Sequence, residues 1–217
     1  MNAKQIIYKL PKLPRRLLIK VISYLEIVLW IAKNKPFPFP HQLKVNILNK
    51  YATKFHIKTL VETGTYLGQT VDDLKDKFNK IYSIELDKKL YQNAKNIYRK
   101  DKNVKIIHGD SASQLIKVVK TLKTPTLFWL DAHYSNGLTA KGNVETPILK
   151  ELIAISKSKI KNHVILIDDA RKFIGINDYP TIKMVQNLIK KYLLGLKLTV
   201  KEDIIIIYPY ESKFLEK

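Results

Sequence analysis

The sequence contains no cysteine among its 217 residues. This absence excludes disulfide bonds, thiolate nucleophiles and cysteine-based zinc sites, and it is typical of a reducing compartment. Acidic residues are also scarce, with 19 Asp and Glu against 39 Lys and Arg, so the formal net charge is +20. Because most of these cations are lysines spread along the chain, charge alone gives little reason to expect nucleic acid as a partner. Because the absence of cysteine is typical of a reducing compartment, we expect a cytoplasmic protein.

Long uncharged hydrophobic segments are absent too. The most apolar stretch, residues 17–32, contains Lys20 and Glu26, each of which would cost roughly 2.5–3.5 kcal/mol near a bilayer centre. A helix lying in the headgroup plane is cheaper, because its basic residues then meet anionic lipid on the inner membrane face. A transmembrane anchor, or packing on its own domain or in a homodimer, are the alternatives. No small-residue cleavage site follows the stretch, so a cleaved signal peptide is not expected.

A proline-rich segment, Lys-Pro-Phe-Pro-Phe-Pro-His at residues 35–41, follows this apolar stretch. Each proline disfavours a helical conformation in the residue before it, so the segment predicts an extended break. We place a domain boundary there. Residues 1–40 then form a basic, apolar helix with its linker, and residues 41–217 form a domain in which 46% hydrophobic composition can fill a core.

Strand and helix patterns alternate along this domain. The last two expected strands are separated by too few residues for a crossover helix, so they must form an antiparallel hairpin. The alternation predicts an α/β fold with a doubly wound, Rossmann-like sheet of seven strands. The expected strands are residues 59–62, 81–85, 104–108, 126–130, 164–167, 197–201 and 203–208, and the expected helices are residues 42–55, 88–99, 112–122, 146–156 and 181–194, with another beginning near Gln69.

The first expected strand leads into a glycine turn. Glu62 ends the strand, Gly64 and Gly68 follow, and a helix begins near Gln69. Glycines allow positive φ angles and a close approach of a ligand to the main chain, and the helix N-terminus offers free N–H groups. The spacing lacks the third glycine of a dinucleotide motif, and a carboxylate at the strand end would attract a cation rather than a pyrophosphate. The turn therefore favours S-adenosylmethionine, although any strand-turn-helix with two glycines could share the pattern.

Acidic residues end each of the first five expected strands. In a doubly wound sheet these ends meet at one edge, where ligands bind. Carboxylates gathered there repel one another unless cations or hydroxyl groups lie between them. The strand-end groups are Glu62, Glu85, His108-Gly109-Asp110-Ser111, Asp131-Ala132-His133 and Asp168-Asp169.

Taken in order, these motifs resemble class I S-adenosylmethionine-dependent methyltransferases. Within that class they are similar to the small metal-dependent O-methyltransferases that act on catechol or caffeoyl-CoA. The resemblance covers about residues 42–210 and implies S-adenosylmethionine as cofactor. The residues carrying it are Glu62-Thr-Gly64-Thr-Tyr66-Leu-Gly68-Gln-Thr70, Glu85, Gly109-Asp110-Ser111, Asp131-Ala-His and Asp168-Asp169-Ala.

The resemblance assigns cofactor-binding roles by position. Glu62 would lie near the ammonium of the methionine moiety, Glu85 would accept hydrogen bonds from both ribose hydroxyls, and Asp110 with Ser111 would meet the adenine edge. Helix capping is the alternative role for Glu85 and Asp110. The full set of implied cofactor-binding residues is Glu62, Gly64, Tyr66, Gly68, Thr70, Glu85, Asp110 and Ser111.

A divalent cation site is also expected. Neighbouring strands lie roughly 4.8 Å apart, so Asp131 and the Asp168-Asp169 pair can reach one ion, and oxygen ligands favour Mg²⁺. The resembled family has an amide where this chain has Asp169. The alternative is that these acids cap helices or hold Arg171 and Lys172.

The catalytic residues expected from the resemblance are Asp131 and His133. A metal on Asp131 would lower the pKa of a substrate hydroxyl, and His133 would act as the base, because Tyr134 replaces the lysine that the family carries there. The alternative for His133 is a loop histidine with no special role. We expect O-methylation of a small-molecule or glycan acceptor; a metal-independent RNA methyltransferase and a non-catalytic membrane-bound scaffold are the alternatives.

Overall fold

A computed structural model describes residues 12–131 and 146–210 of the chain. The chain forms two compact units, residues 1–47 and residues 48–217. The domain boundary expected at residue 40 stays a prediction.

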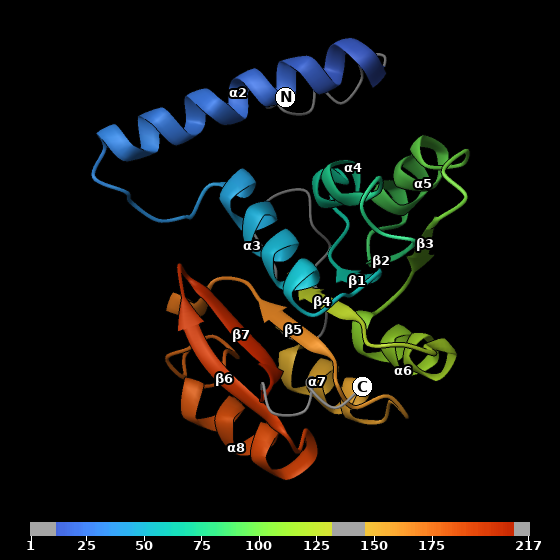
Figure 1. Ribbon diagram of the computed structural model, residues 1–217, viewed down its shortest axis with the longest axis vertical. Helices are drawn as coiled ribbons and strands as arrows, with labels where there is room; N and C mark the ends of the chain where they lie inside the picture. Colours follow the sequence, from blue (N-terminus) through green and yellow to red (C-terminus); the bar gives the residue numbers. More distant parts are fainter. Residues whose placement is uncertain (1–11, 132–145, 211–217) are drawn as a thin grey trace. The chain divides into compact units, whose positions relative to one another are not determined.

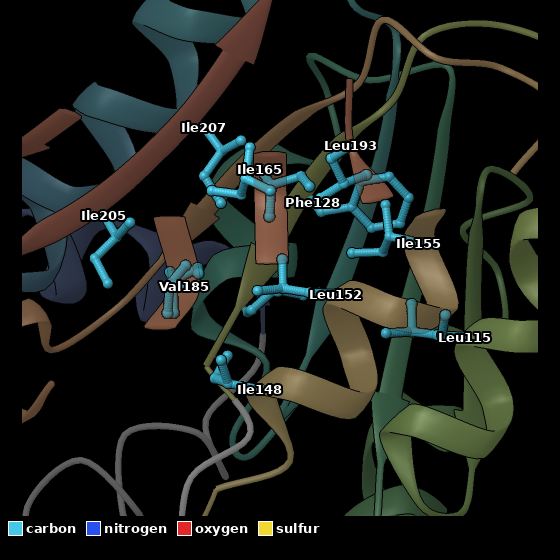
Figure 2. Packing of buried hydrophobic residues seen from close by; sticks show 14 of the residues in the cluster. Leu115, Phe128, Ile148, Leu152, Ile155, Ile165, Val185, Leu193, Ile205 and Ile207 are labelled. Atoms are coloured by element: carbon cyan, nitrogen blue, oxygen red, sulfur yellow. The ribbon is translucent and has the colours of Figure 1, made fainter. Parts of the chain in front are cut away.

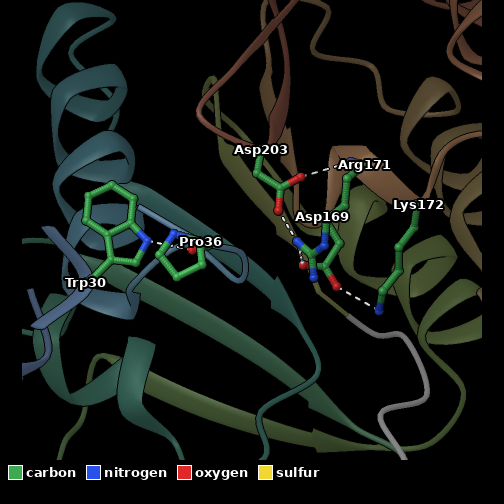
Figure 3. Close-up of polar contacts among 6 residues, drawn as sticks. All are labelled: Trp30, Pro36, Asp169, Arg171, Lys172 and Asp203. Carbon is green, nitrogen blue, oxygen red and sulfur yellow. Dashed lines mark hydrogen bonds and ion pairs between the residues drawn. The ribbon is translucent and has the colours of Figure 1, made fainter. Parts of the chain in front are cut away.

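The first unit contains the helix α2, Lys12–Ala32, and the beginning of α3, His41–Lys54. Helix α2 begins five residues before the apolar stretch, because Pro14 falls in its first turn, where the missing N–H has no partner to lose. At its other end, the Trp30 indole N–H donates to the carbonyl of Pro36 at 2.6 Å (Figure 3). The Trp30 ring also packs edge-on against Phe39. The segment after α2 thus folds back on the helix end.

None of the helices in the described parts of the chain combines the length and the apolar character needed to cross a membrane. This holds for α2 as well, although it is 21 residues long.

The second unit is built on one sheet of seven strands in the order β3-β2-β1-β4-β5-β7-β6 (Figure 1). The first five strands are parallel, and β7 runs antiparallel between β5 and β6. The predicted seven-stranded sheet with an antiparallel hairpin is confirmed. The strands are β1 (Thr59–Thr63), β2 (Lys80–Glu85), β3 (Val104–His108), β4 (Leu127–Leu130), β5 (Val164–Ile167), β6 (Leu196–Lys201) and β7 (Ile204–Pro209).

Helices cover both faces of this sheet. The helices α6, α7 and α8 lie side by side on one face, and α4 and α5 lie on the other (Figure 1). Their bounds are α4 (Gln69–Leu74), α5 (Lys88–Ile97), α6 (Ser111–Thr121), α7 (Ile148–Ser156) and α8 (Ile182–Tyr192), and a short 3-10 helix, η1 (Ala170–Lys172), follows β5.

The core lies between the sheet and α6, α7 and α8. Phe128 of β4 and Ile165 of β5 are fully buried and pack with Leu152 of α7 and Val185 of α8 (Figure 2). Every residue of β4 and β5 is buried, as expected for central strands covered on both faces. This rigid centre fixes the strand ends that form the candidate site.

The hairpin of β6 and β7 differs from its predicted bounds by one residue. Asp203 was expected to begin the last strand, but Glu202 and Asp203 form the two-residue loop, with Lys201 paired to Ile204. Both loop residues have positive φ, of 53° and 62°, which is the backbone of a type I′ turn. Asp203 therefore belongs to the turn and not to β7.

Candidate active site

Strand register brings the ends of five strands to one edge of the sheet. Thr63 of β1 is level with Ile84 of β2 and Leu130 of β4, and Leu130 is level with Ile167 of β5. The residues that follow these positions line up across the edge. They are Glu85, Gly64, Asp131 and Asp168, with His108 of β3 beside Glu85.

The glycine turn has the geometry that the sequence predicts. Gly64 and Gly68 have φ angles of 87° and 78°, a region that side chains disfavour. Gly68 has a second reason to be glycine, because a Cβ there would lie 2.5 Å from the Tyr98 hydroxyl, which donates a hydrogen bond to the Gly68 carbonyl. Tyr98 thus braces the turn from the α5 side.

Glu62 lies buried beneath this turn, with 1% of its surface exposed. The Ser83 hydroxyl donates to Glu62 Oε2 at 2.5 Å, and Thr65 shares a 2.6 Å hydrogen bond with Ser83. Thr70, at the start of α4, also forms a hydrogen bond with the Glu62 side chain. Three hydroxyl groups therefore position this carboxyl, and all three belong to residues that are buried themselves.

Burial raises the pKa of Glu62 to about 8, against an ordinary value of 4.5. The hydrogen bonds from Ser83 and Thr70 oppose this rise, and the negative charges of Asp131 and Glu85 add to it. The strand-end acids therefore lie close enough to affect one another. Such a cluster favours a cationic ligand, because a positive charge would stabilise the ionised carboxylates.

Glu85 is 5% exposed and holds the backbone of two neighbouring turns. Its Oε2 accepts the N–H of Tyr66 at 2.8 Å, and its Oε1 accepts the N–H of Asp87 at 2.8 Å. Burial raises the pKa of Glu85, while these two backbone donors lower it. Each carboxylate oxygen can accept a second hydrogen bond, so ribose hydroxyls would have to share Glu85 with the backbone.

Asp110 caps the helix α6, which was the alternative to a contact with adenine. It precedes α6, and its Oδ2 accepts the N–H of Ser113 at 2.8 Å. Ser111 begins the helix and is buried. The cap does not exclude a contact with adenine, because the Asp110 side chain remains exposed.

The two aspartates after β5 have different surroundings. Asp168 is buried at the strand end, with its backbone N–H bonded to the carbonyl of Leu130. At Asp169 the strand geometry breaks, with φ at 56°, and both oxygens of its carboxylate form ion pairs (Figure 3). Arg171 lies 2.8 Å from one oxygen and Lys172 lies 2.8 Å from the other.

Arg171 is held from a second side by the hairpin turn. Its guanidinium also pairs with Asp203, and its backbone N–H donates to Asp203 Oδ1 at 2.9 Å (Figure 3). The arrangement matches the alternative interpretation of Asp169, as the partner of Arg171 and Lys172. Within residues 12–131 and 146–210, no three His, Cys, Asp or Glu side chains form a group that could hold a metal ion.

The expected base, His133, lies outside the described residues, as does the loop that follows it. Its role stays a prediction. Asp131, the last described residue before this loop, donates its backbone N–H to the carbonyl of Thr63 and is partly exposed at the edge.

Sequence reasoning missed three residues that shape the site. Ser83 and Thr65 complete the hydrogen bonds around Glu62, and Asp203 anchors the loop after β5. Ser83 had a detectable signal, since it is a small polar residue between Tyr82 and Ile84 in the middle of β2, and buried polar groups need partners. Asp203 had none, because its partner is 32 residues away in the sequence.

Solved structures similar to this chain include several methyltransferases. No protein-family model and no curated sequence matches the chain. A protein assigned as a caffeoyl-CoA O-methyltransferase from Staphylococcus aureus is 16% identical, with a TM-score of 0.54 over 92% of this chain and 100% of that one. An O-methyltransferase from Bacillus cereus, solved with S-adenosylhomocysteine, is 16% identical, with a TM-score of 0.53 over 87% and 91%.

The similarity extends beyond O-methyltransferases. A protein assigned as an rRNA methylase from Clostridium thermocellum is 13% identical, with a TM-score of 0.54 over 76% of this chain and 97% of that one. At these identities the likeness establishes the architecture and leaves the methyl acceptor open. The chain has the class I methyltransferase fold.

Proposed function

We propose that the protein is an S-adenosylmethionine-dependent methyltransferase that methylates a hydroxyl oxygen of a small-molecule or glycan acceptor. The observation that carries the proposal is the buried Glu62 beneath the Gly64–Gly68 turn, with Asp131 and Glu85 near enough to raise its pKa. S-adenosylmethionine supplies an activated methyl group on a sulfonium, and it also carries an ammonium. A ligand with two positive charges suits an edge where carboxylates gather.

Several groups fit the cofactor at this edge. Gly64 and Gly68 have positive φ angles and no side chains, so a ligand can approach the main chain of the turn at these two positions. Glu62 would accept the ammonium of the cofactor in its ionised form. Thr70, in the first turn of α4, would lie near the cofactor carboxylate, while Tyr66, at the surface of the turn, would flank the methionine moiety.

In the proposed reaction a base removes the proton from the acceptor hydroxyl, and the oxygen attacks the methyl carbon. The carbon–sulfur bond breaks as the carbon–oxygen bond forms, and its electron pair stays on sulfur. His133 and Asp131 are the proposed catalytic residues, with His133 as the base. Asp131 directly follows β4 and is level with Gly64 of the glycine turn, and His133 comes two residues later in the sequence; this supports the assignment.

The predicted metal ligands Asp131, Asp168 and Asp169 do not fit a cation in the described arrangement. Both oxygens of Asp169 already pair with Arg171 and Lys172, so binding a metal there would break two ion pairs. We assign the metal no step in the proposed reaction. The range of possible acceptors stays broad for the same reason, since an acceptor needs two neighbouring hydroxyl groups only where it must chelate a metal.

Calorimetric titration of S-adenosylhomocysteine into the full chain tests the proposal. We expect micromolar binding that is the same with Mg²⁺ and with EDTA. Glu85→Gln should weaken it by about tenfold or more, because a hydrogen bond to a charged group is lost. Glu202→Gln, at the exposed hairpin turn, is the control and should bind as the wild type does.

Two results would change the conclusion. Absence of binding in every condition would overturn the methyltransferase proposal and favour a non-catalytic scaffold. Binding that requires Mg²⁺ would restore the metal site. Circular dichroism of Glu85→Gln is needed alongside, because Glu85 also holds the backbone N–H groups of Tyr66 and Asp87.

A further inference from the structure

The exposed side of α2 is apolar along its length. Among the side chains that the structure describes on this helix, those at residues 18 and 21–32, every exposed one is hydrophobic. The polar residues Ser23 and Glu26 lie on the partly covered side. The large exposed residues are Leu18, Val21, Tyr24, Leu25, Val28, Leu29 and Ile31.

This pattern is the reverse of that on an ordinary surface helix, which exposes its charged face to water. The exposed residues recur at three- and four-residue spacings, so they form a continuous stripe on a helix about 30 Å long. Apolar surface of this extent marks an interaction site. The stripe therefore needs an apolar partner.

The charge around the stripe specifies the partner further. Residues 1–35 contain one acid, Glu26, and the eight cations Lys4, Lys9, Lys12, Arg15, Arg16, Lys20, Lys33 and Lys35. Lys12, Arg15 and Arg16 come before the stripe in the sequence, and Lys33 and Lys35 come after it. A second copy of residues 1–35 would bring eight cations against eight, which disfavours self-association.

We infer that α2 lies in the headgroup region of an anionic lipid bilayer, with the stripe from Leu18 to Ile31 buried among acyl chains. A bilayer surface combines apolar depth with negative charge, and both match this segment. The helix lies in the membrane plane, since no described helix is suited to crossing a bilayer. The inference does not depend on the proposed methyl transfer.

Vesicle co-sedimentation of the full chain tests the inference. We expect binding to phosphatidylcholine vesicles that contain phosphatidylglycerol, and much weaker binding to phosphatidylcholine alone. The double variant Leu25→Glu with Val28→Glu should bind the anionic vesicles at least about tenfold more weakly, because two apolar side chains are no longer buried.

A matched control comes from the other unit. Leu194→Glu with Val200→Glu makes the same two replacements at exposed sites, with 75% and 47% of the residue exposed against 51% and 44% at Leu25 and Val28. The control should bind vesicles as the wild type does. It carries the same change in net charge, so a difference between the two variants reports the stripe itself.

Three outcomes would overturn the inference. One is equal vesicle binding by both double variants. Another is a dimer in sedimentation velocity that only the α2 variant dissociates, which would assign the stripe to a second copy. The third is a thermal midpoint without vesicles that falls in the α2 variant and not in the control, which would assign it to packing within the chain.

Discussion

Gly68 has no side chain, and this allows Tyr98 at the end of α5 to contact the glycine turn. Its φ of 78° disfavours any side chain, and the Tyr98 hydroxyl occupies the space where a Cβ would stand. Gly175 has a similar φ of 86°, but a Cβ there would approach only Thr181 Cγ2, at 3.1 Å. Replacing each glycine by alanine therefore distinguishes two costs: backbone strain at both positions, and severe steric overlap at Gly68 only.

We predict that Gly68→Ala lowers the free energy of unfolding by about 2–4 kcal/mol, from backbone strain and from displacement of Tyr98. Gly175→Ala should lower it by about 1 kcal/mol, mainly from the backbone, because Thr181 Cγ2 has to shift only slightly. Urea denaturation of both variants measures the difference. Equal losses would show that Tyr98 moves aside without cost.

Individual residues also show where sequence reasoning ends. The acids at the strand ends could be identified because five of them share one position in a repeating pattern. The partners of Glu85 and Asp169 could not, since they depend on turn geometry: a positive φ at Tyr66 directs its N–H to Glu85, and another at Asp169 accompanies its pairing with Arg171.

Among the elements, the hairpin turn between β6 and β7 not only reverses the chain but also holds the short helix η1. Asp203 anchors Arg171 of η1 through its side chain and accepts the N–H of Ala170 at its carbonyl. The loop after β5 is thus fixed by a strand pair at the far end of the sequence. Arg171 in turn holds Asp169 beside the candidate site.

We predict that Asp203→Asn destabilises the protein by about 1–3 kcal/mol, because a buried partner of a charged group is replaced by a neutral one. Asn tolerates the positive φ of this turn and keeps the oxygen that accepts the Arg171 N–H, so the hairpin itself should persist. Unfolding in urea measures this change in the free energy of unfolding. Glu202→Gln is the control and should stay within about 0.5 kcal/mol of the wild type.

Element types were predictable from the sequence, and most bounds agree within two residues. Helix α2 is an exception, because it begins five residues before the apolar stretch and includes Pro14, which the first turn of a helix accommodates. The 3-10 helix η1 was not foreseen either. Its three residues carry no periodicity, and the contacts with Asp203 that hold it are non-local.

For the whole molecule, the pKa of Glu62 links stability to pH. The folded protein keeps this carboxyl protonated up to about pH 8, whereas the unfolded chain releases the proton near the ordinary value of 4.5. The folded state therefore binds more protons between these values, and the free energy of unfolding falls as the pH rises through this window. His163 has the opposite effect: burial lowers its pKa to about 4, so its contribution is lost as the pH falls below its ordinary 6.5.

We predict that Glu62→Gln removes most of the decline in stability between pH 5 and about pH 8, because glutamine cannot ionise. The variant should be more stable than the wild type by a few kcal/mol at the upper end and similar to it at the lower end. Urea titrations at several pH values measure this, and the contribution of His163 cancels in the comparison. Parallel pH profiles would place the Glu62 pKa in the ordinary range.

The strand order has a consequence for synthesis on the ribosome. The central strand β1 is made early, but one of its edges stays open until β4 is made, and β4 begins 64 residues after β1 ends. The apolar strand β5 then waits for β7, the last strand of the described chain, to cover its remaining edge. Until β7 has been made, the nascent chain exposes the unpaired edge of the apolar strand β5. An exposed apolar edge can pair with another chain, so β7 protects the growing sheet from aggregation at this edge.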